Sequence, residues 1–295
     1  MGRVVVGVPI DSVGAAGGTE LAPEELRSAG VVEAVRASDA GDLEVRIVGT
    51  ERDPATGIVG YPTVLATVRG VRDGLAPHLA AGRFPVVLGG CCTLIPGAVA
   101  AARGAAGQPV GLVTIDGHLD LYDAETSETG EAADLPVALC VGRGDEQLAG
   151  VGPARPLVDG SHIALLAHRD SDEARGLGSL MPDQAGIDLS WDDAAVRRRG
   201  PATVATDALK RLTARVDRYW LAIDVDVLAD DVFPATPCKQ PGGLGAEELL
   251  ELAAPLATDP HCIGLSFACY DPDLDTADRA GARDATAMLE RLLAG

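Results

Sequence analysis

Short apolar runs alternate with longer amphipathic stretches along almost the whole chain. Several short runs are continuous and rich in Val and Ile, which is typical of strands buried on both faces of a parallel sheet. The predicted strands are Val4–Val8, Glu44–Val48, Pro85–Leu88, Val110–Ile115, His162–Leu166, Tyr219–Ile223 and Cys262–Phe267. The predicted helices are Pro23–Ala29, Pro62–Ala81, Leu94–Arg103, Trp191–Arg199, Thr203–Val216, Ala246–Ala257 and Ala277–Leu293.

This alternation predicts one α/β domain over residues 1–295, a three-layer α/β/α sandwich with a mainly parallel central sheet. The glycine-rich segment Gly142–Gly160 is predicted to be a loop within that domain, because regular elements continue on both sides. Ser190 stands three residues before Asp193, a capping-box spacing for the helix Trp191–Arg199. The basic run that ends this helix is predicted to lie at its C-terminus, where cations interact favourably with the dipole.

Composition and charge narrow the classes of function. Hydrophobic residues make up 47% of the chain and aromatic residues 3%, so we expect a core built mainly from Ala, Val and Leu. The formal net charge of −20 argues against nucleic acid as a partner, because phosphate contacts need clustered Lys and Arg. No apolar stretch approaches the ~18 residues that a membrane span needs, so no membrane partner is expected. Six unevenly spaced cysteines indicate reduced thiols and a cytoplasmic protein rather than a disulfide framework.

Two predicted strands run directly into closely spaced polar side chains. Asp116, His118 and Asp120 follow the first of them, and Asp224 and Asp226 follow the second. Alternate residues of an extended segment point to the same side, so each set converges on one point. Either set alone could cap a turn or a helix. Together, four carboxylates are stable as anions only with cations among them, which indicates a metal site where ligands of parallel sheets bind.

A third strand end runs into Gly89-Gly90-Cys91-Cys92-Thr93. The paired glycines allow close backbone approach, and Cys92 precedes a helix whose N-terminal field favours a thiolate. The alternative is that both cysteines are small apolar fillers, and the role of Cys91 stays open.

With these motifs in place, the chain resembles the arginase–agmatinase–formimidoylglutamase family, the ureohydrolases. The family's Asp-Ala-His-x-Asp motif appears as residues 116–120, and its Asp-x-Asp-x-Leu-Asp-Pro stretch resembles residues 224–228, with Pro-Gly-Gly at 241–243. Further segments in the family's order are 18–27, 89–92 and 169–172. The matches span roughly residues 7–272 and imply an arginase-like fold.

The resemblance implies two divalent ions, with Mn²⁺ as the expected metal, and a hydroxide between them as the nucleophile. Asp116 and Asp224 would bridge the ions, Asp120 would complete one shell, and His118 with Asp226 would complete the other. Carboxylates suit Mn²⁺, and two cations make hydroxide available at neutral pH. The hydroxide would attack the planar carbon of a guanidinium or amidine, with Asp120 helping to stabilise the tetrahedral intermediate.

The chain departs from the family at its ligands and at its substrate contacts. Cys92 replaces a metal-binding histidine, and as the expected ligand it would shift preference toward Zn²⁺, Fe²⁺ or Ni²⁺. Cys269 falls where the family has the acidic residue that grips the guanidinium. The proton-shuttle histidine would fall near Ala133. We therefore expect a substrate other than plain arginine, with Glu131 or Asp134 replacing the lost acid.

Glu131 is accordingly predicted as a catalytic residue beside Asp120, and as a substrate-binding residue beside Asp134, Asp172 and Cys269. Asp172 could instead be a simple cap. His162 and His168 are interpreted as structural or supporting groups rather than ligands. Cys238 lies in the loop between Asp226 and the Pro-Gly-Gly segment, near the predicted site, and its role stays open.

The predicted function is hydrolysis of a linear C–N bond in a guanidino, hydroxyguanidino or amidino small molecule. One alternative is a catalytically degenerate protein with a structural or regulatory role. Another is a metal-dependent amide deacetylase, although those enzymes use a histidine pair that this chain does not show. The resemblance also implies a homo-oligomer, a trimer or a hexamer.

Overall fold

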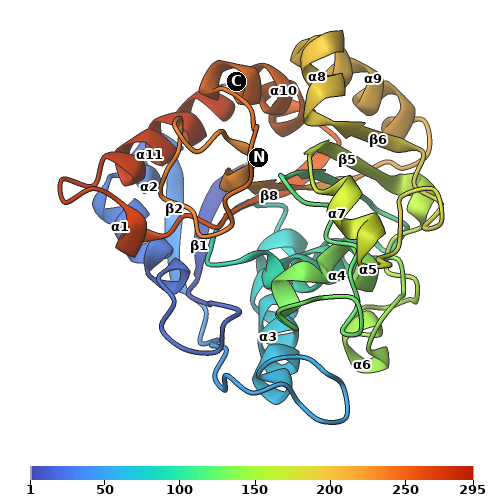
Figure 1. The fold of residues 1–295 in the computed structure, drawn as a ribbon. Helices are drawn as coiled ribbons and strands as arrows, with labels where there is room; N and C mark the ends of the chain where they lie inside the picture. Colours follow the sequence, from blue (N-terminus) through green and yellow to red (C-terminus); the bar gives the residue numbers. More distant parts are fainter. Residues whose placement is uncertain (1, 295) are drawn as a thin grey trace.

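An eight-stranded parallel sheet crosses the molecule, with helices on both faces (Figure 1). The computed structural model describes residues 2–294. The strand order is β2-β1-β3-β8-β7-β4-β5-β6. The strands are β1 (Arg3–Val8), β2 (Ala37–Asp42), β3 (Phe84–Gly89), β4 (Gly111–Ile115), β5 (Ile163–His168), β6 (Leu189–Asp192), β7 (Tyr219–Asp224) and β8 (Cys262–Ala268). The predicted three-layer α/β class is confirmed.

The central strands are buried along their whole length, as continuous apolar runs predict. Every residue of β3, β4, β5, β7 and β8 is buried. The last strand of the chain, β8, pairs with β3 on one side and β7 on the other, so it closes the middle of the sheet. This insertion brings together the ends of strands that are far apart in sequence.

The helices form two layers (Figure 1). One layer holds α3 (Tyr61–Ala80), α4 (Ile95–Ala106), α5 (Pro136–Cys140) and α6 (Glu146–Ala149). The other holds α1 (Ala22–Ser28), α2 (Val31–Ala34), α8 (Asp193–Arg199), α9 (Pro201–Thr213), α10 (Ala246–Thr258) and α11 (Ala280–Leu292). The short α7 (Ser171–Gly176) follows β5.

The predicted strand Glu44–Val48 is wrong. The strand of this region is β2, a polar and largely exposed segment at the sheet edge, where no apolar pattern is needed. Val45, from the predicted strand, packs against α3 instead, together with the preceding Leu43. A Cβ on Gly70 would lie 2.5 Å from Val45, and one on Gly74 would lie 2.5 Å from Leu43, so these glycines make room for the two side chains.

The predicted capping box at Ser190 is also wrong. Residues 189–192 form β6, which sequence analysis missed, and α8 begins only at Asp193. Asp192 caps the helix, because its side chain accepts a hydrogen bond from the Ala195 backbone N–H. The basic run Arg197–Arg199 does lie in the last turn of α8, as predicted.

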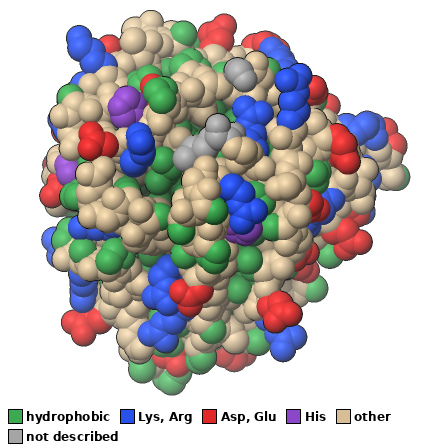
Figure 2. Space-filling model, turned by 180° about the vertical axis from the view of Figure 1, so that it is seen from behind, with side chains coloured by type: hydrophobic (Ala, Val, Ile, Leu, Met, Phe, Trp, Pro, Cys, Tyr) green, Lys and Arg blue, Asp and Glu red, His purple; other side chains and the backbone are tan. Residues whose placement is uncertain are grey.

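No helix between residues 2 and 294 combines the length and apolar character needed to cross a membrane. On the face that Figure 2 shows, basic and acidic side chains lie interspersed rather than gathered in a basic patch.

Candidate metal centre

The six predicted metal ligands lie at the ends of three strands. Asp116, His118 and Asp120 follow β4. Asp224 and Asp226 lie at the end of the neighbouring β7, and Cys92 follows β3, which is two places from β7 in the sheet. The strands β3, β8, β7 and β4 are consecutive in the sheet, and their carboxyl ends meet at one edge. A cavity of about 70 Å³ lies there. It is lined by Cys92, Asp116, His118, Asp120, Tyr122, Ala133, Asp134, Asp224, Asp226, Cys238 and Cys269.

One half of the centre contains only nitrogen and oxygen ligands. His118 Nδ1 lies 2.9 Å from Asp226 Oδ2 and 3.7 Å from Asp116 Oδ1. One potential ligand atom from each of these three residues lies within 4.8 Å of the other two, close enough for one ion to bind all three. The backbone N–H of Gly117 donates to Asp226 Oδ1 at 3.0 Å and leaves Oδ2 for the imidazole side.

The other half contains thiols. The Cys92 thiol donates to Asp224 Oδ2 at 2.9 Å and lies 3.8 Å from Asp116 Oδ2. Cys92 forms two compact groups of possible ligands, one with Asp116 and Asp120 and one with Asp224 and Cys269. The predicted ligands therefore lie in one cluster with two overlapping sites.

The local backbone fixes which carboxylate oxygens face the cavity. Asp116 Oδ1 accepts the His118 backbone N–H at 2.7 Å, and Asp224 Oδ1 accepts that of Asp226 at 2.8 Å. Each turn therefore occupies one oxygen and leaves Oδ2 near Cys92. Asp120 has a left-handed φ of 53°, and its carbonyl accepts two backbone N–H groups from the start of α5. This contact holds the Asp120 side chain inward.

The carboxylates of the cluster are buried close together, so they can all be ionised only with cations among them. The four aspartates are at most 5% exposed. Burial, together with neighbouring carboxylates, raises the pKa of Asp120 and Asp224 well above the usual range. The Asp120 Oδ2 atom is buried without a hydrogen-bond partner among residues 2–294. A divalent cation would supply that partner and keep the carboxylates ionised, so the residues fit a binuclear metal centre.

The strand β5 supplies supports for the ligands. Arg169 Nη2 donates to the Asp226 carbonyl at 2.6 Å, and Asp170 Oδ1 accepts the Leu119 backbone N–H at 3.1 Å. Sequence analysis matched this segment to the family but did not assign these roles. Their position directly after the strand beside β4 was the available signal.

Of the predicted substrate-binding residues, Asp134 and Cys269 line the cavity, whereas Glu131 and Asp172 do not. Asp134 lines the cavity, and its Oδ2 accepts hydrogen bonds from Ser127 at 2.5 Å and Thr129 at 2.8 Å. Glu131 is not among the lining residues; its Oε2 accepts the Ser12 hydroxyl at 2.5 Å. Asp172 is exposed and pairs with Arg175 at 3.0 Å, away from the cavity.

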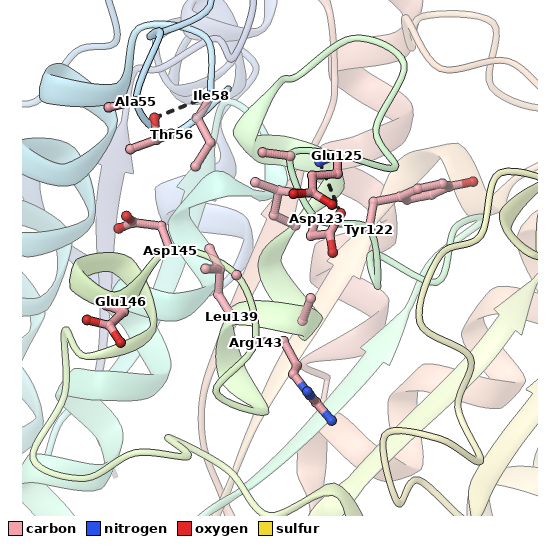
Figure 3. Close-up of a pocket in the computed structure, with 14 residues that line it drawn as sticks. Ala55, Thr56, Ile58, Tyr122, Asp123, Glu125, Leu139, Arg143, Asp145 and Glu146 are labelled. Atoms are coloured by element: carbon pink, nitrogen blue, oxygen red, sulfur yellow. Dashed lines mark hydrogen bonds between the residues drawn. The ribbon is translucent and has the colours of Figure 1, made fainter.

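Three lining residues, Tyr122, Ala133 and Cys238, were not predicted as site residues, although Cys238 was expected to lie near the site. Tyr122 also borders a wider cavity of about 370 Å³ beside the metal centre, which Figure 3 shows with Asp123, Glu125 and Arg143. Cys238 reaches the metal cavity from the long loop after β7, although its residue surface is largely exposed. Only the folded loops decide these contacts, so no strand-end pattern could reveal them.

His162 and His168, which were interpreted as structural or supporting groups, lie outside the cavity. His168 is buried between Ser190, whose Oγ lies 2.8 Å from Nε2, and Ser171, whose Oγ lies 3.0 Å from Nδ1. His162 ends a short 3₁₀ turn before β5. Neither lines the metal cavity.

Comparison with known proteins identifies relatives across the whole chain. The model of the arginase family matches residues 2–295. An arginase from Brevibacillus brevis is 26% identical over 300 residues, which cover 97% of this chain and 95% of the relative. The crystal structure of the arginase from Bacillus caldovelox superposes with a TM-score of 0.89 at 24% identity, covering 100% of this chain and 99% of that one. The proclavaminate amidino hydrolase from Streptomyces clavuligerus superposes with a TM-score of 0.71 at 21% identity, with 99% and 90% covered.

Proposed function

Because this chain belongs to the arginase family, we propose that it hydrolyses a linear C–N bond in a guanidino, hydroxyguanidino or amidino compound, using two divalent metal ions. The chain is a hydrolase of C–N bonds other than peptide bonds. The observation that carries the proposal is the convergence of four buried aspartates, His118 and Cys92 on one cavity.

The proposed ligands come from the overlapping groups described above, in which Asp116 belongs to two groups and Asp224 to one. When bound, two divalent cations would lower the pKa of the water between them and so supply a nucleophile at neutral pH. Asp120 lines the cavity, and its buried Oδ2 has no hydrogen-bond partner among residues 2–294. This oxygen can therefore accept a proton from water, or a hydrogen bond from an N–H of the substrate. This arrangement supports Asp120 as a catalytic residue.

Asp134 is the proposed acid that binds the positive end of the substrate. Its carboxylate borders the cavity and is oriented by two hydroxyl groups, so it is positioned before the substrate arrives. Glu131 precedes it on the same loop and contacts Ser12 of the N-terminal loop. We propose that Glu131 holds these two loops together around the substrate entrance and acts on turnover through them.

A substrate other than plain arginine is proposed because of Cys269. This residue lines the cavity where the family's acidic contact to the guanidinium is expected, and a buried thiol is a poor anion there. Burial is among the causes that raise the pKa of Cys269 well above its usual range, which keeps the free thiol neutral. The charge complementarity that a guanidinium needs must then come from another group, which favours Asp134.

The test begins with elemental analysis of protein purified without chelators or added metals. We expect about two ions per chain, in line with a binuclear site. Release of amine and urea is then measured against a panel of guanidino, hydroxyguanidino, amidino and N-acetylated amine compounds. Turnover of N-acetylated amines alone would favour the deacetylase alternative, and two bound ions without any turnover would favour a degenerate protein. Failure to bind metal at all would overturn the proposal.

Cytoplasmic location and assembly into a trimer or hexamer also belong to this proposal. Three buried cysteines lie outside the metal cavity, and none of the cysteines among residues 2–294 forms a disulfide, which supports a reducing compartment. Light scattering of the purified protein would measure the oligomer directly.

A further inference from the structure

Three consecutive strands place two thiols and a carboxylate together at one side of the metal cavity. Cys92 follows β3, Cys269 follows β8, and Asp224 ends β7. The two sulfur atoms and a carboxylate oxygen of Asp224 lie within 4.8 Å of one another, and all three residues are buried. Sequence analysis assigned Cys269 to the substrate, but this geometry gives it another partner.

We propose that Cys269 is a metal ligand, and that it forms with Cys92 and Asp224 a site for a thiophilic cation, Zn²⁺ by its chemistry. The opposite site, formed by Asp116, His118 and Asp226, takes a harder cation such as Mn²⁺. The centre is therefore mixed, with one thiolate-bound ion and one ion bound by nitrogen and oxygen. This inference rests on the proposed binuclear centre and names which metal each half selects.

The backbone at Cys269 is built to aim its side chain inward. Its φ is 65°, in the left-handed region, and its backbone N–H donates to the Gly90 carbonyl at 2.7 Å. A side chain in this sparsely populated backbone region is strained, and such a conformation persists where the surroundings require it. At Cys269 this conformation places the thiol between the ends of β3 and β7.

Close packing at Gly90 restricts movement of the backbone segment that carries Cys92. A Cβ at Gly90 would lie 1.7 Å from the Ile10 carbonyl oxygen, so the segment that carries Cys92 is pressed directly against the end of β1. The Gly90 carbonyl in turn holds Cys269. Gly90 therefore links the backbone segments that carry the two thiols.

Ligand chemistry separates the two halves of the cavity. Thiolates select Zn²⁺ over harder cations, whereas carboxylate and imidazole ligands accept Mn²⁺. Cys91 provides the internal contrast: it is as buried as Cys92, but its thiol donates to Thr93 Oγ1 at 3.3 Å and does not line the cavity. Two adjacent cysteines thus have different partners, and only one faces the centre.

The first experiment is a loading competition read by elemental analysis, with no activity assay. Chelator-stripped full-length protein is incubated with one equivalent each of Zn²⁺ and Mn²⁺ per chain and then desalted, because an excess of Zn²⁺ would fill both sites. We expect about one ion of each per chain in the wild type and in the control Cys91→Ser. Loss of a supporting group near a metal costs about 10–100-fold in affinity, so Cys92→Ser and Cys269→Ser should each weaken Zn²⁺ binding at least that much.

The second experiment counts the thiolates. Co²⁺ bound to thiolates gives a charge-transfer band in the near ultraviolet, whose intensity scales with the number of sulfur ligands. Each single variant, Cys92→Ser or Cys269→Ser, should lose about half of the band, whereas Cys91→Ser should keep it. X-ray absorption of the Zn²⁺-loaded wild type should find two sulfur atoms at about 2.3 Å, so the result does not depend on a variant that folds poorly.

The outcomes separate this inference from the proposed function. A full-strength band in Cys269→Ser, or one sulfur around zinc in the wild type, would show that Cys269 is no ligand while two bound ions leave the hydrolase intact. Two Mn²⁺ and no Zn²⁺ in the wild-type competition would overturn the mixed centre. A wild type that binds neither metal would overturn the proposed function itself.

Discussion

His118 Nδ1 lies 2.9 Å from Asp226 Oδ2, across the ends of the neighbouring strands β4 and β7. Burial disfavours the charged imidazole, but Asp226 and Asp116 outweigh it and raise the pKa of His118 well above its usual value. Burial likewise opposes a charged Asp226, whose pKa is nevertheless held below its usual range, chiefly by His118. In the metal-free protein this pair is therefore an ion pair, and a cation must displace the imidazole proton to bind.

Metal removal should make stability depend on pH. The pKa of Asp120 and Asp224 is raised by burial, and that of His118 by its carboxylates. Groups with a raised folded-state pKa stabilise fully below the unfolded pKa, and this contribution is lost as pH rises through the folded value. We expect the melting temperature of chelator-treated protein to fall as pH rises above the ordinary carboxyl pKa of about 4. Calorimetry that finds it rising would contradict the assignment.

Saturating metal should restore the lost stability. A ligand at about 100 times its Kd adds about 2.7 kcal/mol, and each kcal/mol shifts the melting temperature by roughly 2–4 °C in a larger domain. We therefore expect a rise of roughly 5–10 °C at about pH 8, measured with and without metal in the same buffer. A Cys92→Ser/Cys269→Ser double variant should retain only part of this rise.

Gly117→Ala should weaken metal binding, although the family motif has Ala at this position. A Cβ here would lie 2.5 Å from Arg169 Nη1 and 2.9 Å from Asp226 Oδ1, so it would displace a ligand and its support. We expect about 10–100-fold weaker affinity by calorimetric titration. The control is Gly176→Ala in α7, where an added Cβ meets nothing within 4 Å. Equal metal affinity in both variants would contradict the prediction and show that the Arg169 side chain moves aside without disturbing Asp226.

Asp134→Asn should reduce turnover without changing metal content. The variant keeps the size of the side chain but removes the charge that is proposed to bind the substrate cation, so kcat/KM should fall by about 10–100-fold. Glu131→Gln should have a smaller effect, because its carboxylate contacts Ser12 rather than the cavity. Glu128→Gln, on the exposed part of the same loop, is the control. Unchanged kcat/KM in Asp134→Asn would remove it from the substrate site.

His168 should remain neutral far below the usual pKa of histidine. Burial lowers its pKa to about 4, and two serine hydroxyls occupy its nitrogens. A depressed pKa means that its stabilising contribution is present above about pH 6.5 and is lost as pH falls toward 4. NMR of the imidazole should show titration only in that acidic range, and a midpoint near 6.5 would contradict this burial.

The sequence was sufficient for the parallel sheet and for placing five residues of the candidate metal centre at strand ends. Continuous apolar runs can be satisfied only between two helix layers, and polar residues directly after such runs must lie at the sheet edge. The edge strand β2 was not predicted, because its polar and exposed residues form no apolar pattern. The apolar run that was predicted in its place packs against glycines of α3.

Contacts between strand ends were decided by tertiary structure. That Cys269 meets Cys92 and Asp224 depends on β8, the last strand, entering between β3 and β7. That Asp134 faces the cavity while Asp172 faces solvent depends on how the segment after β4 and the short helix α7 pack. Side-chain periodicity is a local property of the backbone, so the sequence alone specifies which residues end a strand. Strand order and loop packing arise from burial summed over the whole chain, and only the folded molecule shows which of those ends become neighbours.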